Sequence, residues 1–468
     1  MARAILRRRR PWAALAAASA AAVLPVMAVG GAAWLQASLG RQLRSVRHCA
    51  ASATAERTTS AALRGQQLRL PETYVPPERD GEAGIYCSKS GFALQAVASN
   101  VGLRSWSTWY QAPWWLQQGD AMTLFAAFGR DSDAIEYDRH MVEALDGGIL
   151  ALDVVRTASG TAQALPPRDT APFVLLVSGL GGGSQGGYVR NMATSLMRSG
   201  CAVAVLNMRG CAGSPLRTAR GFSGCRGSTD DVRVAVRYAR EVLLGGGSAA
   251  EQAPVLLLGW SLGGNIVANA LAEQSYGAGK GHAGALTAVQ AGAALAATHD
   301  MAKSSRLCEQ RLASRVLYNG FVARSLVRQF LPYESLFRRG PVPRWADDEP
   351  VVELDVDMFL GASTIREIDE AMTRRVFGYD SVDEYYACAS SCTRLDRVEV
   401  PLLLVSAADD PVSSEWVPID AVRANPNLVL AYTAHGGHLG WQDDEDARRS
   451  KWVEQTVADF FDSTLRQW

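Results

Sequence analysis

The sequence Val255-Leu-Leu-Leu-Gly-Trp-Ser-Leu-Gly263, which continues as Asn265-Ile-Val-Ala-Asn-Ala-Leu-Ala272, decides the fold. Its uninterrupted apolar residues predict a buried strand, and the alanine-rich continuation has the composition of a helix. A Gly-x-Ser-x-Gly pattern between such a strand and such a helix favours a sharp turn that lifts the Ser261 hydroxyl above a sheet, because the glycines permit that turn. A glycine-rich turn that carries no reaction is the alternative interpretation.

The same alternation of strands and helices continues on both sides of this stretch. Short apolar runs without polar alternation are typical of parallel strands that helices cover on both faces. We therefore expect an α/β fold, with a mostly parallel sheet flanked by helices. Between about residues 299 and 390 charged helical sequence replaces the strand pattern, which predicts a helical cap inserted at the carboxyl edge of the sheet. The apolar runs are 173–177, 202–206, 255–258, 402–405 and 428–430.

A serine hydroxyl is a poor nucleophile until a base removes its proton, so an acid and a histidine should follow Ser261 in that order. The sequence has six histidines, and only His435 and His438 follow an acid that comes after a late strand. Asp409 and Asp410 come shortly after the apolar run 402–405 and are both candidates for that acid. The order serine, acid, histidine is therefore satisfied, with two aspartates and two histidines left as alternatives.

Backbone N–H groups usually stabilise the oxyanion that forms during attack on an ester carbonyl. One should be the N–H of Leu262, and the other should come from the glycine-rich loop 178–184. The pattern Gly181-x-Gly183-x-x-Gly186 in this region also fits a dinucleotide-binding loop. In NAD-binding proteins the next strand ends in an Asp or Glu that binds the ribose, but here it ends in Asn207-Met-Arg209. An arginine suits the phosphate of NADP, so the dinucleotide alternative is limited to an NADP-type oxidoreductase.

The N-terminal fifty residues contain eight arginines and no acid, whereas the rest of the chain carries 39 basic and 47 acidic side chains. Residues 11–36 have no charge and are long enough to span a bilayer. We therefore expect residues 1–40 to be a single-pass anchor of the signal-anchor type in an endomembrane or at the cell surface, with the N-terminus in the cytoplasm. A signal peptide cut within 28–33, giving a secreted or organelle-targeted protein, is the alternative. Residues 41–105 resemble a stalk, and 106–468 should form the catalytic domain.

The charge balance also limits the partners of this protein. The net charge of zero argues against nucleic acid, and the acidic body argues against electrostatic binding to anionic lipid surfaces. Cys388 and Cys392 have no His or Cys companions at zinc-site spacing, so we expect no metal, and no cofactor is expected. The eight cysteines are compatible with disulfides if the body lies in a secretory lumen.

Residues from about Gly119 to the C-terminus resemble the YheT-like subfamily of α/β-hydrolase-domain proteins, which includes membrane-anchored lipases and phospholipases. The resemblance implies an α/β-hydrolase fold, and it implies that Asp410 and His438 act in place of Asp409 and His435. The matching residues are Gly179-Leu180, Gly182-Gly-Ser184, Tyr188-Val-Arg190, Asn207, Arg209-Gly-Cys211, Gly259-Trp-Ser-Leu-Gly263, Asn265, Thr364-Ile-Arg-Glu367, Asp369, Tyr385-Tyr386, Ser390-Ser391, Asp409-Asp-Pro411 and His435-Gly-Gly-His-Leu-Gly440.

Taken together, the residues and the resemblance predict a serine hydrolase that cleaves lipid esters. Ser261 would attack the carbonyl, His438 would carry the proton, Asp410 would orient His438, and the Leu180 and Leu262 N–H groups would hold the oxyanion. Substrates within the family's range are monoacylglycerol, short- or medium-chain esters and phospholipids. Two alternatives remain open. One is acyl transfer to an alcohol by the same triad, and the other is a catalytically silent binding protein.

Overall fold

The computed structural model describes residues 82–88, 91, 110–158, 171–274, 289–342, 351–413, 417–443 and 451–466, all within one compact unit, Leu68–Trp468. Within these residues one sheet of nine strands runs in the order β1-β9-β8-β7-β6-β4-β5-β3-β2. Neighbouring strands from β5 to β9 are parallel, and β1, β2 and β3 pair antiparallel at the edges. The strands are β1 (Gly84–Cys87), β2 (Ile135–Glu143), β3 (Ile149–Ala158), β4 (Phe173–Val177), β5 (Ala202–Asn207), β6 (Val255–Trp260), β7 (Val289–Leu295), β8 (Leu402–Ala407) and β9 (Leu428–Thr433).

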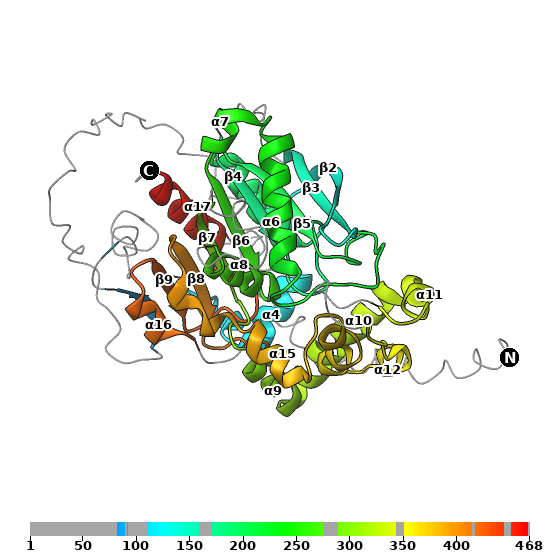
Figure 1. Cartoon of the computed structure of the whole chain (residues 1–468). Helices are drawn as coiled ribbons and strands as arrows, with labels where there is room; N and C mark the ends of the chain where they lie inside the picture. The colour runs from blue at the N-terminus through cyan, green and yellow to red at the C-terminus, as the bar shows by residue number, and fades with distance from the viewer. Residues whose placement is uncertain are drawn as a thin grey trace, which may run out of the picture. The chain divides into compact units, whose positions relative to one another are not determined.

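Helices cover both faces of this sheet, which explains why its central strands are apolar throughout. In β4, Leu175 belongs to the same core cluster as residues of α6 (Ser228–Tyr238), α8 (Leu262–Ala272) and α16 (Ile419–Ala424). The next residue, Leu176, belongs to the core on the opposite face with residues of α5 (Gly187–Arg198) and α17 (Trp452–Leu465). Figure 1 shows α6 and α8 in front of the sheet. The predicted α/β fold with a mostly parallel sheet is confirmed.

A group of helices lies between β7 and β8, where the sequence predicts a cap. Figure 1 shows α9, α10, α12 and α15 together beyond one end of the sheet. This is the carboxyl end of the strands, because Gln329 of the cap donates from Nε2 to the carbonyl of Gly181, just after β4, at 3.2 Å. The helices are α9 (Met301–Gln310), the π-helical η6 (Ser314–Asn319), α10 (Gly320–Phe330), α11 (Glu334–Phe337), α12 (Val356–Gly361), α13 (Ile365–Ile368), α14 (Arg374–Val376) and α15 (Val382–Ala389).

The structure differs from the sequence-based expectation at one edge of the sheet. Gly84–Cys87, inside the range expected to be a stalk, forms β1 and pairs with β9. A strand of four residues is too short to show a periodic pattern, and its partner lies more than 300 residues away. The anchor expected for residues 1–40 falls outside the described residues. Among the residues that are described, no helix is both long enough and apolar enough to cross a membrane.

Candidate active site

The predicted turn at Ser261 is present between β6 and α8. Ser261 has φ 51° and ψ −121°, a conformation that residues with a side chain seldom adopt. The two glycines of the pattern are required by space. A Cβ added to Gly259 would lie 2.2 Å from the Gly263 carbonyl oxygen, and one added to Gly263 would lie 2.3 Å from the Val177 carbonyl oxygen. The serine is therefore held at the carboxyl end of the sheet, where it lines a pocket.

Three of the predicted residues lie in one hydrogen-bonded chain. His438, in the loop after β9, has Nε2 at 3.0 Å from Ser261 Oγ. Its Nδ1 lies 2.9 Å from Oδ2 of Asp410, in the loop after β8. Residues separated by up to 177 positions in the sequence thus meet because parallel strands end at the same edge of the sheet.

The surroundings of Asp410 keep its carboxylate in one orientation. Its Oδ1 accepts hydrogen bonds of 2.8 Å from the backbone N–H groups of Val412 and Ser413. The Asp410 side chain is only 2% exposed, so these two donors replace the water that would solvate the charge in solution. Both oxygens face His438, whose Nδ1 lies 2.9 Å from Oδ2 and 3.1 Å from Oδ1, an arrangement that fixes a ring orientation and a tautomer.

The alternative pair, Asp409 and His435, forms a separate contact. Asp409 Oδ2 lies 3.5 Å from His435 Nδ1, and Asp409 Oδ1 accepts from the Gly437 N–H at 2.8 Å. Burial raises the pKa of Asp409 above its ordinary value, and the partly exposed His435 opposes that rise. In the described part of the chain, neither side chain hydrogen-bonds to Ser261 or His438.

The loop after β4 approaches Ser261 at the expected place. A Cβ on Gly179 would lie 3.3 Å from the Cβ of Ser261, so the backbone at this position faces the serine directly. The Gly179 N–H donates to the hydroxyl of Tyr188 at 3.2 Å, which fixes the loop. Leu180 and Leu262 line the same pocket as Ser261, and within the described residues neither donates its N–H to a protein acceptor.

Two positioning contacts were not predicted from the sequence. Thr123 in α4 (Gly119–Phe128) accepts the His438 backbone N–H at 2.8 Å and donates to the Gly119 carbonyl at 2.6 Å. Asp120, on the same helix, accepts from the hydroxyl of Tyr318 in η6 at 2.8 Å. Helix α4 therefore joins the histidine loop to the cap. A threonine within an apolar helix, about 300 residues before its partner, gives no local signal of this role.

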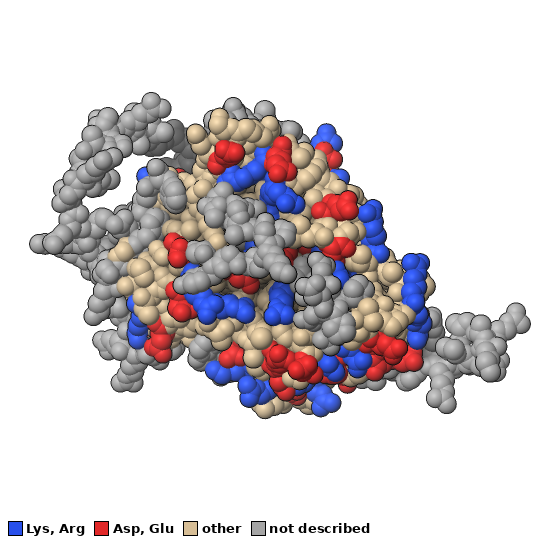
Figure 2. Space-filling model, viewed as in Figure 1, with Lys and Arg blue, Asp and Glu red and all other residues tan. Residues whose placement is uncertain are grey.

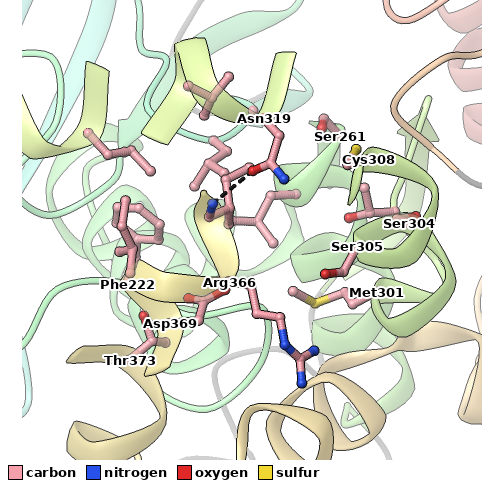
Figure 3. A pocket seen from close by; sticks show the side chains of 18 of the residues that line it. Phe222, Ser261, Met301, Ser304, Ser305, Cys308, Asn319, Arg366, Asp369 and Thr373 are labelled. Carbon is pink, nitrogen blue, oxygen red and sulfur yellow. Dashed lines mark hydrogen bonds between the residues drawn. The ribbon is translucent and has the colours of Figure 1, made fainter. Parts of the chain in front are cut away.

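A cavity of about 290 Å³ extends from Ser261 beneath the cap. Figure 3 shows Ser261 with the cap residues around it, including the amide oxygen of Asn319, which accepts from the Ile365 N–H at 2.8 Å. Most of the wall is apolar, and burial raises the pKa of Asp369, a rare carboxyl in it, to about 6. Aromatic and aliphatic residues from several cap helices supply the lining, among them Leu326, Phe330, Phe337, Phe359, Ile368 and Met372.

The glycine-rich loop is explained by packing. A Cβ on Gly183 would lie 2.1 Å from the Cβ of Ala212, and the Ser184 N–H donates to Asn207 Oδ1 at 2.9 Å. The glycines thus permit close contact with the end of β5, a role that needs no nucleotide. As for metals, the described residues hold no group of three His, Cys, Asp or Glu side chains suited to an ion. The seven cysteines among them form no disulfide with one another.

Comparison with protein families gives a match over residues 174–449, more than half of the chain, to the alpha/beta hydrolase family. The chain belongs to the alpha/beta hydrolase family. The matched region begins in β4 and extends beyond His438, so it contains Ser261, Asp410 and His438.

Several curated proteins are similar to this α/β hydrolase. Phospholipase ABHD3 of Homo sapiens is 28% identical over 350 residues, covering 74% of this chain and 76% of the relative. Monoacylglycerol lipase of Saccharomyces cerevisiae is 27% identical, covering 62% and 59%. Medium-chain fatty acid ethyl ester synthase/esterase 2 of the same yeast is 31% identical, covering 62% of each chain. Among solved structures, esterase Pf2001 of Pyrococcus furiosus aligns with 13% identity and a TM-score of 0.42, over 70% of this chain and 92% of that one.

Proposed function

We propose that this α/β hydrolase cleaves carboxylic esters of lipids through an acyl-enzyme on Ser261. The observation that carries the proposal is the chain Ser261–His438–Asp410, which borders a cavity with mostly apolar walls. A serine bonded to a histidine, with that histidine oriented by a buried carboxylate, is an activated nucleophile. An apolar cavity next to it favours an acyl chain over a polar substituent.

In the first half of the reaction, Ser261 Oγ bonds to the ester carbonyl carbon while His438 Nε2 takes the hydroxyl proton. The carbonyl oxygen becomes an anion, which the N–H groups of Leu180 and Leu262 stabilise. The C–O bond to the alcohol then breaks, and His438 gives its proton to the departing oxygen. In the second half, water attacks the acyl-serine, His438 takes and returns a proton in the same way, and the fatty acid leaves.

Monoacylglycerols, short- or medium-chain esters and phospholipids are the proposed substrates. The names of the relatives support this range, since they include a phospholipase, a monoacylglycerol lipase and an ester synthase/esterase. The motifs that resemble the YheT-like subfamily support a place within it. The synthase/esterase relative also favours a second candidate, acyl transfer from the acyl-serine to an alcohol. Adding an alcohol and comparing the new ester with free fatty acid among the products would separate the two reactions.

The test of the proposed function is the variant Ser261→Ala. It should lose fluorophosphonate labelling and p-nitrophenyl ester turnover, with an unchanged melting temperature. Ser305→Ala is the matched control, because Ser305 also lines the pocket but lies on α9, away from the hydrogen-bonded chain. Labelling or turnover that survives in Ser261→Ala would overturn the assignment of the nucleophile.

We further propose that residues 1–40 form a single-pass membrane anchor. Support comes from the uncharged segment 11–36, which has arginines on both sides. The intact protein should stay in the membrane pellet after extraction at alkaline pH and at high salt. Release into the supernatant, or a mature N-terminus beyond residue 28, would favour the cleaved signal peptide instead.

A further inference from the structure

The cap segment formed by η6 and α10 (Ser314–Phe330) has two different faces. One face lines the cavity beside Ser261, through residues that include Tyr318, Val322 and Leu326. These three positions are four residues apart, as expected for one side of a helical segment. The segment is therefore both a wall of the candidate active site and part of the outer surface of the cap.

The outer face of this segment and of its flanking residues is apolar and exposed. Leu312 is 76% exposed, and Val316 and Phe321 are 53% and 51% exposed. Leu317 and Leu331 add to the same surface at 37% and 50%. Exposure of apolar surface to water costs about 25 cal/mol for each Å². A group of large exposed apolar side chains therefore commonly marks an interaction site.

Arginines are interspersed with these apolar residues. Between Gln310 and Tyr333 the chain has four arginines and no acidic residue. Arg311 pairs with Asp120 at 3.6 Å. The other three, Arg315, Arg324 and Arg328, are exposed and form no ion pair within the described residues. This surface is thus locally cationic, although the chain beyond its first fifty residues carries a net charge of −8 and Figure 2 shows Asp and Glu side chains spread among Lys and Arg over one face of the molecule.

We propose that the outer face of η6 and α10 docks on an anionic lipid surface. Apolar side chains between uncompensated arginines are the composition of helices that lie in the membrane interface, where the arginine stems lie along the apolar region and the guanidinium groups reach lipid phosphates. A second copy of this chain fits the surface poorly, because a two-fold contact would bring like-charged arginines together. Docking would place the wall of the lipid pocket next to the lipid.

This docking differs from the proposed anchor, which would hold the protein near a membrane without orienting the cap. Docking on anionic lipid also revises the expectation, drawn from the acidic body, that electrostatic binding to anionic lipid surfaces is disfavoured. At ordinary salt this attraction depends on charges within about 10 Å of the membrane and not on the net charge of the chain. The activity measurement below rests on the proposed lipid ester hydrolysis, whereas the binding measurement does not.

The binding measurement uses the full-length chain as its Ser261→Ala variant, so that no lipid is consumed. Hydrogen exchange of peptides from residues 310–333 is followed with phosphatidylcholine vesicles, with and without phosphatidylserine. Docking should slow exchange in these peptides about five-fold or more when phosphatidylserine is present, and high salt should reverse the effect. Unchanged exchange, or equal slowing with both vesicles, would overturn the proposal. Slowing without vesicles at raised protein concentration would overturn it in favour of a second copy.

The activity measurement uses a pair of double variants on the active chain. Phe321→Ser/Arg324→Glu changes the docking face without touching a pocket residue, whereas Val242→Ser/Arg237→Glu makes the same changes at exposed positions around η4 (Ala239–Leu243). The first variant should lose about ten-fold or more of its turnover of vesicle-borne ester. It should keep its turnover of a water-soluble ester, which also shows that it is folded.

The control variant should keep both activities. Equal loss of vesicle turnover in the test and control variants would overturn the proposal. Absence of soluble-ester turnover in the unsubstituted chain would instead count against the proposed function, and it would leave the exchange measurement to decide the docking.

Discussion

Replacing Asp410 by asparagine should disable the candidate triad through the orientation of a single amide. The Asp410 carboxylate accepts from the Val412 and Ser413 N–H groups with Oδ1, and His438 Nδ1 lies 2.9 Å from Oδ2 and 3.1 Å from Oδ1. In Asp410→Asn the amide oxygen should keep the position that faces the two donors, which places the NH₂ group against His438. The NH₂ group then takes the position nearer to Nδ1, 2.9 Å against 3.1 Å, and because it donates, His438 should accept at Nδ1 and carry its proton on Nε2. In that tautomer Nε2 cannot take the proton of Ser261.

The size of the effect follows from the two backbone donors. Turning the amide over would restore the useful tautomer, but it would leave two buried N–H groups facing an NH₂ group. Each unsatisfied buried donor costs about 1–3 kcal/mol, so the productive orientation lies roughly 2–6 kcal/mol above the unproductive one. Turnover should therefore fall by about 10³- to 10⁴-fold, which is the usual effect of losing the orienting carboxylate in such triads.

The assay is kcat/KM for a water-soluble p-nitrophenyl ester, with the rate of fluorophosphonate labelling as a second measure. Asp409→Asn is the matched control, because Asp409 is the adjacent residue and pairs with His435 instead. The control should lose less than about ten-fold, since no hydrogen bond to His438 is changed. If Asp410→Asn kept more than about a tenth of the turnover, or if Asp409→Asn lost as much as Asp410→Asn, the tautomer argument would be refuted.

Three further predictions concern the elbow, the histidine loop and the pocket. Gly263→Ala should lower the melting temperature sharply or prevent folding, because its Cβ would lie 2.3 Å from a carbonyl oxygen of β4, whereas Gly361→Ala, with open space around it, should be neutral in the same thermal scan. Thr123→Val should lower kcat about ten-fold with little change in KM, because the His438 N–H loses its acceptor. A change in KM as large as the change in kcat would contradict a positioning role. Folding raises the pKa of Asp369 to about 6 from 3.8, so the folded state loses stability as the pH rises between these two values. Asp369→Asn cannot ionise, so its free energy of unfolding, measured with denaturant, should rise relative to that of the parent by up to about 3 kcal/mol between about pH 4 and pH 8. A difference that does not change with pH would show that the raised pKa is wrong.

Local sequence patterns predicted much of the fold because each depends on neighbouring residues only. The apolar runs correctly predicted the strands β4, β5, β6, β8 and β9, since a strand covered on both faces has no polar positions, but they missed the central strand β7 (Val289–Leu295), whose residues are mostly small. The spacing in Gly259-Trp-Ser-Leu-Gly263 predicted the turn, since a side chain at either glycine would collide with main chain. The order serine, acid, histidine limited the candidate triad to two aspartates and two histidines. The roles of Ser261, Asp410 and His438 stay predictions until the variants are measured.

Contacts between distant segments could not be read from the sequence in this way. The strand Gly84–Cys87 is too short to show a pattern and is defined only by its pairing with β9. Thr123 acquires its contact with His438 only when α4 lies against the loop after β9. The sequence also left Asp409 and Asp410 as alternatives, because adjacent residues share the same local environment and differ only in the direction of their side chains.

The sequence alone determined the architecture, the elbow and the small set of residues able to perform nucleophilic chemistry, because backbone propensity and apolar periodicity act over a few residues. The tertiary structure decided which aspartate faces His438, which cap residues enclose the cavity, and which face of η6 and α10 remains in water. Those outcomes depend on the packing of segments far apart in the chain. The overall charge concealed the cationic, apolar surface of the cap for the same reason, since a sum over residues contains no information about their positions.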